Sequence, residues 1–424
     1  MKPHRRDQSE VKKPKTFALR AAAQPSRGIR RTTLVGLTVI ATFAAALFAV
    51  AGQTTAGATP PKEGPCDIYA AAGTPCSAAY STTRALSHSF DGKLYQVTRM
   101  SDGSATDIGV LSPGGFANAA TQDRFCAHTR CVVSKIYDQS GNDNTLIPQG
   151  PTTAFYSNTD WSHLPVVANK LPVYAGGHPV YGLRFDDDSP TGIPCVSAKT
   201  CIGNKGEAYN NGNKRAKGVA VGAEPESVYA VFGGQHTGDQ CCSDFGNSEI
   251  SGTDNGPGHM DAVNFSRACW NQCGPGTGPW VQADLEDGMF MTGQTIYVPF
   301  HPGSVVGGSY RQGLGGCCAT TAKNLSMPYP FVTAVLDSPG VNTFAIRGAK
   351  SEAQGLTTFY DGALPPGVGY SPMHKEGAII LGSGGDQGTT NGDFFEGAMT
   401  VGVPPLSVQN AVQRNIAAVN YTMR

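Results

Sequence analysis

Three acidic residues lie within four positions in Asp284-Leu285-Glu286-Asp287, just after Trp280. Alternate residues of a strand share one face, so an extended chain would place Asp284 and Glu286 side by side. Repulsion between such close carboxylates raises the pKa of one of them, which suits acid–base or nucleophilic catalysis. Hydrolysis of a glycosidic bond, for example, needs two carboxyl groups. The alternative is a solvated acidic turn.

A further acid, Asp386, lies in the glycine-rich turn Gly382-Ser383-Gly384-Gly385-Asp386-Gln387-Gly388, directly after the apolar run Ala378–Leu381. Glycine lets the backbone approach a ligand closely, so this turn can present one carboxyl group at a strand end. An ordinary Asp-Gly turn is the alternative. The turn lacks the spacing and lysine of a phosphate-binding loop, which argues against nucleotide binding.

The twelve cysteines all lie beyond residue 58, which indicates disulfides formed in an oxidising compartment. No C-x-x-C pair occurs, so we expect neither a zinc site nor another metal. For the adjacent pair Cys241-Cys242, a strained vicinal disulfide and bonds to distant cysteines both remain open. Close spacing favours four local disulfides, Cys66–Cys76, Cys126–Cys131, Cys195–Cys201 and Cys269–Cys273, and leaves Cys317-Cys318 as a second adjacent pair.

Trp270 and Trp280 are two of only three tryptophans, and their rings are suited either to stacking on a sugar or to core packing. A Ser-His-Asp hydrolase is the main rival mechanism. The sequence has no G-x-S-x-G nucleophile elbow, and its nine histidines show no order that supports a triad.

The elements that must position these residues are mainly strands. Gly and Pro make up close to a fifth of the chain, and helical periodicity is sparse. A helix after an N-cap at Ser407 is expected, following a strand that ends in Phe394–Gly397. We therefore predict an all-β fold, a single large lectin-like jelly-roll β-sandwich over 65–424 with few short helices. The expected strands include Lys93–Arg99, Val132–Tyr137, Ser227–Phe232, Phe331–Leu336, Thr343–Arg347 and Ala378–Leu381.

The amino terminus has the pattern of an export signal. Residues 1–31 carry ten basic and two acidic residues, and the apolar run Leu34–Val50 is followed by Ala56-Gly57-Ala58. We expect a signal peptide over 1–58, a lead-in over 59–64 and secretion, with a signal anchor as the alternative. The remainder has a net charge of −8, which argues against nucleic-acid binding, and we expect no stable membrane partner after cleavage.

Several motifs resemble glycoside hydrolase family 54, the arabinofuranosidase B type, from Cys66 nearly to the end of the chain. They are Gly64-Pro65-Cys66-Asp67-Ile68-Tyr69, Ser81-Thr82-Thr83-Arg84-Ala85-Leu86, Leu94-Tyr95-Gln96-Val97, Thr106-Asp107-Ile108-Gly109-Val110-Leu111, Ile136-Tyr137-Asp138-Gln139-Ser140-Gly141-Asn142, Gly258-His259-Met260 and Lys375-Glu376-Gly377-Ala378-Ile379-Ile380-Leu381-Gly382.

The resemblance implies a retaining, exo-acting α-L-arabinofuranosidase that removes arabinose side chains from arabinan or arabinoxylan without a cofactor. It assigns the nucleophile to Glu286 and the acid/base to Asp386. It also implies a vicinal disulfide Cys241–Cys242 that forms a wall of the arabinose subsite. Two further disulfides, Cys66–Cys76 and Cys126–Cys131, follow in the same way. Sugar contacts fall on Trp270, Asp284, Gly385 and the adjoining Asp287.

Three features depart from the family pattern. Asp287 stands where asparagine is expected, which adds a charge beside the nucleophile. Six cysteines, Cys195, Cys201, Cys269, Cys273, Cys317 and Cys318, exceed the family's framework. The sequence ends at Arg424, so we expect the family's C-terminal arabinose-binding β-trefoil to be missing. The alternative functions are a β-xylosidase or mixed-specificity pentosidase, and a non-catalytic arabinan-binding lectin on the same sandwich.

Overall fold

Short strands dominate because runs of Val, Ile, Phe and Tyr are interrupted every few residues by Gly, Pro, Asn or Asp. All the described residues belong to one structural unit, Thr55–Arg424. The computed structural model describes residues 61–148, 152–153, 160–161, 165–185, 207–238, 243–251, 255–268, 272, 274–286, 288–293, 323–366, 369–382 and 391–424.

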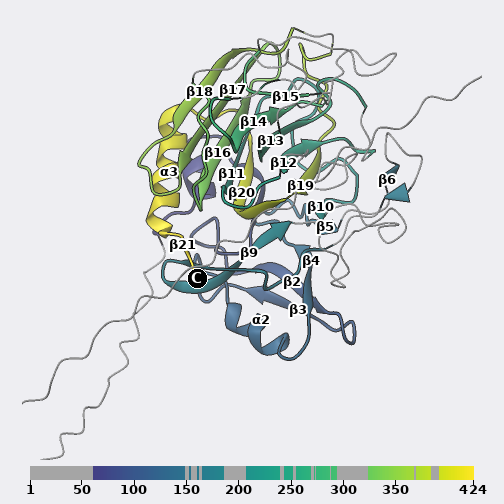
Figure 1. The fold of residues 1–424 in the computed structure, drawn as a ribbon, viewed down its shortest axis with the longest axis vertical. Coiled ribbons are helices and arrows are strands. Elements are labelled where there is room, and N and C mark those ends of the chain that lie inside the picture. The colour runs from purple at the N-terminus through teal and green to yellow at the C-terminus, as the bar shows by residue number, and fades with distance from the viewer. Residues whose placement is uncertain are drawn as a thin grey trace, which may run out of the picture. The chain divides into compact units, whose positions relative to one another are not determined.

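The larger of the two main sheets has nine strands in the described part of the chain (Figure 1). Its order is β18-β17-β16-β11-β20-β9-β8-β21, and β1 pairs with β20 outside this path. The strands are β1 (Cys76–Ser81), β8 (Leu171–Ala175), β9 (His178–Phe185), β11 (Glu226–Gly233), β16 (Val332–Ser338), β17 (Thr343–Lys350), β18 (Thr357–Ala363), β20 (Gly392–Val401) and β21 (Thr422–Met423).

The second main sheet has seven strands among the described residues, in the order β15-β14-β13-β12-β19-β10-β5. They are β5 (Ile147–Pro148), β10 (Ala208–Asn210), β12 (Asp244–Ser248), β13 (Asp261–Ser266), β14 (Trp280–Asp284), β15 (Met289–Phe290) and β19 (Ala378–Gly382). Two smaller sheets consist of β2 (Lys93–Arg99), β3 (Ala105–Gly109) and β4 (Cys131–Ile136), and of β6 (Thr152–Thr153) and β7 (Asp160–Trp161).

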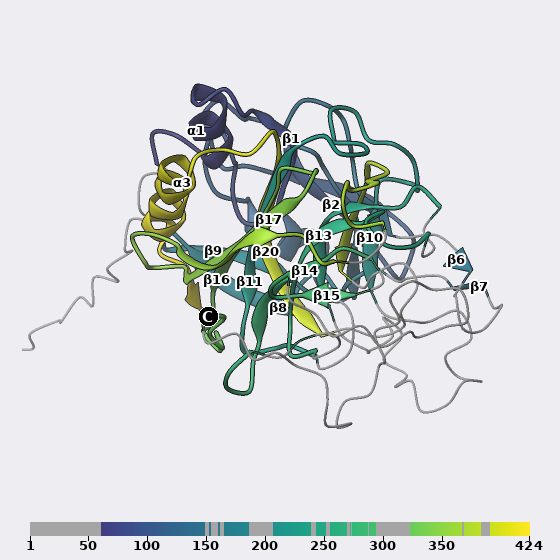
Figure 2. The ribbon, with the colours of Figure 1, turned by 90° about the horizontal axis from the view of Figure 1, so that it is seen from above.

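The core lies between the two main sheets, which Figure 2 shows from above. Phe232 of β11 stacks on Phe265 of β13 with ring centroids 5.6 Å apart, and Phe245 of β12 lies 5.4 Å from Phe394 of β20. Every residue of β11 is buried, as its continuous apolar run predicts for a central strand. These contacts form a β-sandwich, which confirms the predicted all-β class.

Three short helices are present in the described chain: α1 (Pro65–Ala71), α2 (Ala119–Phe125) and α3 (Leu406–Val419). The terminal helix was predicted, and it buries Val412, Ile416 and Val419 on its apolar stripe. The predicted N-cap was wrong, because Pro405 occupies that position and Ser407 is the second helical residue. The preceding strand β20 also continues past Gly397 to Val401, because β11 pairs with it along this whole length. None of the helices in the described segments is long and apolar enough to cross a bilayer.

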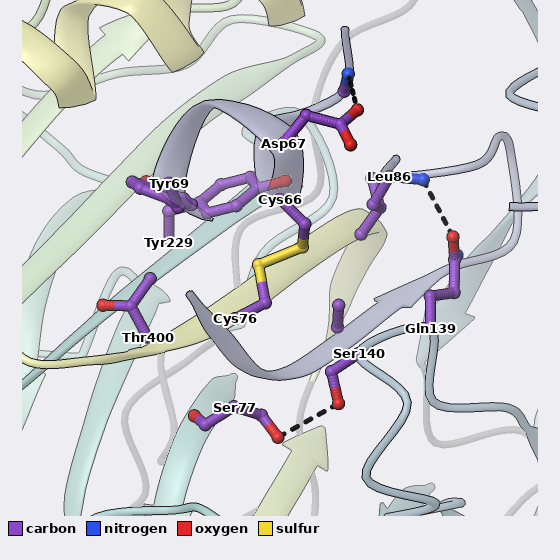
Figure 3. The surroundings of a disulfide bond; sticks show 12 residues. Cys66, Asp67, Tyr69, Cys76, Ser77, Leu86, Gln139, Ser140, Tyr229 and Thr400 are labelled. Carbon is purple, nitrogen blue, oxygen red and sulfur yellow. Dashed lines mark hydrogen bonds between the residues drawn. A yellow bond between two sulfur atoms is a disulfide. The ribbon is translucent and has the colours of Figure 1, made fainter. Parts of the chain in front are cut away.

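Two disulfides hold the amino-terminal part of the sandwich. Cys66 at the start of α1 is bonded to Cys76 at the start of β1 (Figure 3), and Cys126 after α2 is bonded to Cys131 of β4. Close by, the side chain of Gln139 accepts a hydrogen bond of 2.8 Å from the Leu86 amide, and the α1 residue Tyr69 packs on Tyr229 of β11. The disulfides Cys66–Cys76 and Cys126–Cys131 both match the predicted local pairings. The other eight cysteines lie outside the described residues.

Candidate active site

A row of buried polar side chains crosses the second sheet on the face that points away from the core. Alternation sends Val281 and Ala283 of β14 into the hydrophobic core, so Gln282 and Asp284 point to the opposite, outer face. Register aligns Gln282 with Asn264 of β13, and Asn264 with Asp244 of β12. All of these side chains are buried, so this outer face is covered rather than exposed to solvent.

Hydrogen bonds order this polar row. The Asn264 side-chain amide donates to the Asp244 carboxylate at 2.7 Å, and the Ser266 hydroxyl donates to the Asn264 oxygen at 2.7 Å. The Gln282 amide donates to the carbonyl of Ala268 at 3.0 Å, while its own side-chain oxygen has no protein partner in the described structure. A buried acceptor without a partner is costly, and a ligand hydroxyl would satisfy it.

Asp284 lies one row further along β14. In register it faces Ala262 of β13, which in turn faces Gly246 of β12. A Cβ on Gly246 would lie 2.7 Å from the Cα of Ala262, so only glycine fits between these strands. Ala262 also belongs to a small apolar cluster with Ala208, Met260 and Ile380 on the same outer face. Through Ala262, Asp284 therefore lies in register with this small apolar cluster.

Glu286 lies in the turn that joins β14 to β15. The strand ends at Asp284, the Leu285 amide donates to the Gly288 carbonyl at 3.3 Å, and Glu286 has a φ of +61°. The Asp284 carboxylate accepts the Glu286 amide at 3.2 Å. The expectation of a continuous strand through Glu286 is therefore wrong, because the chain reverses there. Asp284 and Glu286 are only 6% and 7% exposed, which excludes the solvated acidic turn.

Two neighbouring loops support this turn. The Tyr370 hydroxyl donates a hydrogen bond of 2.9 Å to the Glu286 carbonyl, and the Tyr370 ring meets Phe290 edge-on at 5.2 Å. The Gly258 amide donates to the Leu285 carbonyl at 2.7 Å, and the His374 amide donates to the Gly258 carbonyl at 2.8 Å. The backbone of Glu286 is thus fixed by contacts with residues distant in sequence.

A buried charged cluster anchors the loop that carries Tyr370. Lys375 lies 3.4 Å from a Glu226 oxygen and 3.5 Å from an Asp261 oxygen, and all three side chains are inaccessible to solvent. Burial raises the pKa of Glu226 to about 8; the positive charge of Lys375 opposes this rise and the Asp261 carboxyl adds to it. Burial alone would lower the pKa of Lys375, but the two acids raise it above its usual value.

Several predicted site residues lie outside the described residues, namely Asp386, Gly385, Cys241, Cys242, Trp270 and Asp287. The described strands nevertheless show where their segments begin. Gly382 at the end of β19 pairs with Asp244 at the start of β12, and Asp244 pairs with Asn264 near the end of β13. The described strand residues nearest in sequence to Asp386, the Cys241-Cys242 pair and Trp270 therefore lie at one end of the sheet. Glu286 follows the opposite end of β14.

Sequence reasoning missed the polar row and the supporting Tyr370. The alternation Trp280-Val281-Gln282-Ala283-Asp284 does carry a signal for the row, because an alternating strand with one apolar face presents its polar residues on the other. No comparable local signal marks Tyr370. In the described segments, no group of three or more His, Cys, Asp or Glu side chains is arranged to hold a metal ion.

Comparison with protein families gives one matching model, described as the catalytic domain of alpha-L-arabinofuranosidase B, over residues 65–422. The probable alpha-L-arabinofuranosidase B of Aspergillus flavus is 42% identical over 383 residues, and the alpha-L-arabinofuranosidase B of Aspergillus oryzae is 41% identical over 383 residues. Each alignment covers 88% of this chain and 66% of the relative. The chain thus spans 66% of the length of these relatives.

Two solved structures are also similar. One is an arabinofuranosidase complexed with arabinofuranosyl-alpha-1,2-xylobiose, with a TM-score of 0.71 and 40% identity. The other is a family 54 arabinofuranosidase soaked with a cyclic sulfate inhibitor, with a TM-score of 0.71 and 39% identity. Each alignment covers 85% of this chain and 66% of the other.

Proposed function

This chain belongs to the family of alpha-L-arabinofuranosidase B catalytic domains, and on that premise we propose that it is a retaining, exo-acting α-L-arabinofuranosidase. The observation that carries the proposal is the buried pair Asp284 and Glu286 at the end of β14. Buried carboxylates beside a row of buried polar side chains suit a sugar site and are costly in a purely structural turn.

The proposed mechanism is double displacement. Ionised Glu286 attacks the anomeric carbon while protonated Asp386 gives its proton to the departing glycosidic oxygen. A water molecule, deprotonated by Asp386, then attacks the arabinosyl–Glu286 ester and releases arabinose with its configuration retained. This reaction requires a separation of about 5–5.5 Å between the two carboxyl groups, whereas inversion requires about 6.5–9.5 Å. No metal or organic cofactor takes part.

We assign Asp284 the role of positioning the nucleophile. Its carboxylate accepts the Glu286 amide, so it orders the turn that carries the nucleophile. We assign the remaining sugar contacts to Trp270, the Cys241-Cys242 disulfide, Gly385 and Asp287. An aromatic ring and a weakly polar sulfur surface suit the C–H faces of a furanose, while Asp287 and the backbone at Gly385 suit its hydroxyls.

We propose terminal arabinofuranosyl groups of arabinoxylan and arabinan as the substrate. A similar enzyme has been solved with arabinofuranosyl-alpha-1,2-xylobiose, in which the arabinose is carried on a xylose chain. The test is product analysis on arabinoxylan and branched arabinan, with proton NMR to identify the first anomer released. Free arabinose in the α configuration is expected. The β anomer as first product would exclude retention, and release of xylose from nitrophenyl xyloside in its place would indicate a xylosidase.

Glu286→Gln is the variant that tests the nucleophile. We expect turnover to fall by at least about a thousandfold, because removal of a covalent nucleophile typically has effects of that order or larger. The thermal unfolding temperature should stay close to that of the parent protein. A Glu286→Gln enzyme with parental activity would refute the assignment. Arabinan binding by the parent protein without any released sugar would instead favour a lectin.

We also propose that the protein is secreted. The apolar run Leu34–Val50 and the small residues Ala56-Gly57-Ala58 support an export signal, and the disulfides Cys66–Cys76 and Cys126–Cys131 support passage through an oxidising compartment. Amino-terminal sequencing of protein from the culture medium should begin near Thr59. Protein retained in the cell with Met1 intact would contradict export.

A further inference from the structure

Two sequence motifs that the proposed mechanism does not use meet in the structure. They are Gly258-His259-Met260, just before β13, and Lys375-Glu376-Gly377, just before β19. Nδ1 of His259 lies 2.8 Å from a carboxylate oxygen of Glu376. The two residues are 117 positions apart in sequence, so the fold of the second sheet brings them together.

Glu376 is the centre of a small hydrogen-bonded cluster. One of its carboxylate oxygens accepts His259 and the side-chain amide of Asn255 at 2.7 Å, and the other accepts the backbone amide of Ile250 at 2.9 Å. Burial acts to raise the pKa of the Glu376 carboxyl, but the hydrogen bonds from these three donors lower it below its usual value. An ionised carboxylate only accepts hydrogen bonds, so Nδ1 of His259 carries the proton that it donates.

The loop that carries Glu376 is fixed from its other side. The amide of Gly377 donates to the buried side-chain oxygen of Asn247 on β12 at 2.8 Å. Lys375 exchanges two backbone hydrogen bonds with Gly222, of 2.7 and 3.2 Å, and its side chain lies in the buried acidic cluster described above. Glu376 is therefore attached to an anchored part of the sandwich.

The turn that carries His259 contacts the backbone beside Glu286. The Gly258 amide donates to the Leu285 carbonyl at 2.7 Å, and the Gly258 carbonyl accepts the His374 amide at 2.8 Å. The rings of His259 and His374 also stack, with centroids 5.6 Å apart. Gly258 thus lies between the anchored loop and the residue that precedes the proposed nucleophile.

The His259–Glu376 pair is better suited to holding local geometry than to stabilising the whole fold. Its side chains are 31% and 16% exposed, and partly exposed ion pairs contribute little to the free energy of unfolding. Catalysis is more sensitive, because a displacement of about 1 Å caused far from the reacting atoms can lower a rate about a hundredfold. Loss of the pair should therefore affect turnover more than folding.

We propose that His259 and Glu376 are positioning residues for the nucleophile. Glu376 holds His259, and the turn of His259 holds the Leu285 carbonyl and with it the backbone of Glu286. Neither His259 nor Glu376 is assigned a contact with the sugar. This inference rests on the proposed function, and it adds a support behind the nucleophile that reaches it through backbone contacts alone.

The test compares His259→Leu with His259→Asn. Leucine removes the donor, whereas the asparagine amide can take the place of Nδ1 and still donate to Glu376. On nitrophenyl arabinofuranoside, His259→Leu is expected to lower kcat about tenfold. The inhibition constant of free arabinose, which measures binding in the ground state, should change less than about twofold. His259→Asn should retain at least about half of the parental kcat, because the hydrogen bond is kept.

Two further variants complete the design. His88→Leu is the matched control, because Nδ1 of His88 lies 3.0 Å from a carboxylate oxygen of Asp67 on α1, a similar pair outside the second sheet, and both constants should stay at parental values. Glu376→Gln tests the other partner, since its new NH₂ group cannot accept a hydrogen bond, and kcat should again fall about tenfold. Hydrogen-exchange mass spectrometry should show faster exchange in the peptide that contains Gly258 in both His259→Leu and Glu376→Gln.

Parental kcat in His259→Leu would overturn the proposal, and so would a loss of kcat that His259→Asn does not restore. An inhibition constant for arabinose that rises as much as kcat falls would overturn it too, because His259 would then act on the sugar site as a whole. Unchanged exchange in the Gly258 peptide would have the same consequence. A parent protein that hydrolyses no arabinofuranoside would instead refute the proposed function itself, whereas an active parent with unaffected variants refutes only the positioning role.

Discussion

The hydroxyl of Tyr370 donates a hydrogen bond of 2.9 Å to the backbone carbonyl of Glu286. Glu286 has a φ of +61°, a conformation that costs a non-glycine residue roughly 1–3 kcal/mol and persists only where its surroundings enforce it. Tyr370 is fully buried and packs edge-on against Phe290 of the returning strand β15. The tyrosine therefore holds the backbone of the proposed nucleophile in this conformation.

Replacing Tyr370 with phenylalanine should lower kcat with little change in KM. The ring still packs, but one hydrogen bond worth about 1 kcal/mol is lost, which corresponds to roughly a fivefold slower reaction if the turn loses its reactive geometry. Steady-state kinetics on nitrophenyl arabinofuranoside measure this. Tyr80→Phe is the matched control, because the buried Tyr80 hydroxyl also donates to a carbonyl, that of Asn144, away from the turn. A similar loss in both variants would remove the positioning role of Tyr370.

Asp386→Asn should affect substrates according to their leaving groups. A xylose hydroxyl leaves only with a proton, whereas nitrophenolate leaves without one, so loss of the acid matters mainly for the sugar substrate. We expect kcat/KM on arabinofuranosyl-xylobiose to fall by about 10²–10⁴-fold and far less on nitrophenyl arabinofuranoside. Added azide should restore turnover of the aryl substrate and form α-arabinosyl azide. Equal losses on both substrates would contradict the acid/base assignment.

Much of the sandwich could be predicted because its strands carry local signals. The predicted strand Lys93–Arg99 coincides with β2, and the run Val228–Phe232 lies inside the fully buried β11. The helix α1 was missed although it has such a signal. Pro65 occupies its first turn, and the Asp67 carboxylate accepts the Gly64 amide at 2.7 Å. A seven-residue helix offers too little periodicity to detect, so only its cap marks it.

The site was predictable only in part, since it depends on contacts between distant segments. The acids at Asp284 and Glu286 were found from their spacing, but the turn at Glu286 was not, because glutamate seldom adopts a positive φ. Its supports, Gly258 and Tyr370, lie 28 residues before it and 84 residues after it in sequence. Nothing in the local composition around Glu286 specifies them.

Gly258→Ala should destabilise the protein more than Gly256→Ala, a glycine substitution in the same loop. Gly258 has a φ of +79°, and an added Cβ would overlap the carbonyl oxygen of Gly369. A combined cost of about 2–4 kcal/mol is expected from the strained backbone and the clash. Gly256→Ala is the matched control, because Gly256 also has a positive φ, +108°, but an added Cβ would meet nothing within 4 Å. Chemical denaturation measures both; equal losses would exclude the clash.

The buried cluster of Glu226, Asp261 and Lys375 should make stability fall as the pH rises toward 8. Burial raises the pKa of Glu226 to about 8, well above its value in the unfolded chain, so the folded protein holds a proton there that the unfolded chain has lost. Between pH 5 and 8 the folded state thus binds more protons, and the free energy of unfolding decreases by up to about 1.4 kcal/mol per pH unit.

Glu226→Gln separates this effect from all other titrations. Glutamine keeps the shape and can still accept the hydrogen bond of 2.9 Å that the Asn247 side chain donates to Glu226, but it does not ionise in this range. The difference in unfolding free energy between parent and variant, measured by urea denaturation at pH 5, 6, 7 and 8, should therefore shift steadily in favour of the variant. A difference that does not change with pH would mean that Glu226 is already ionised in the folded protein at pH 5, with Lys375 as its counter-charge.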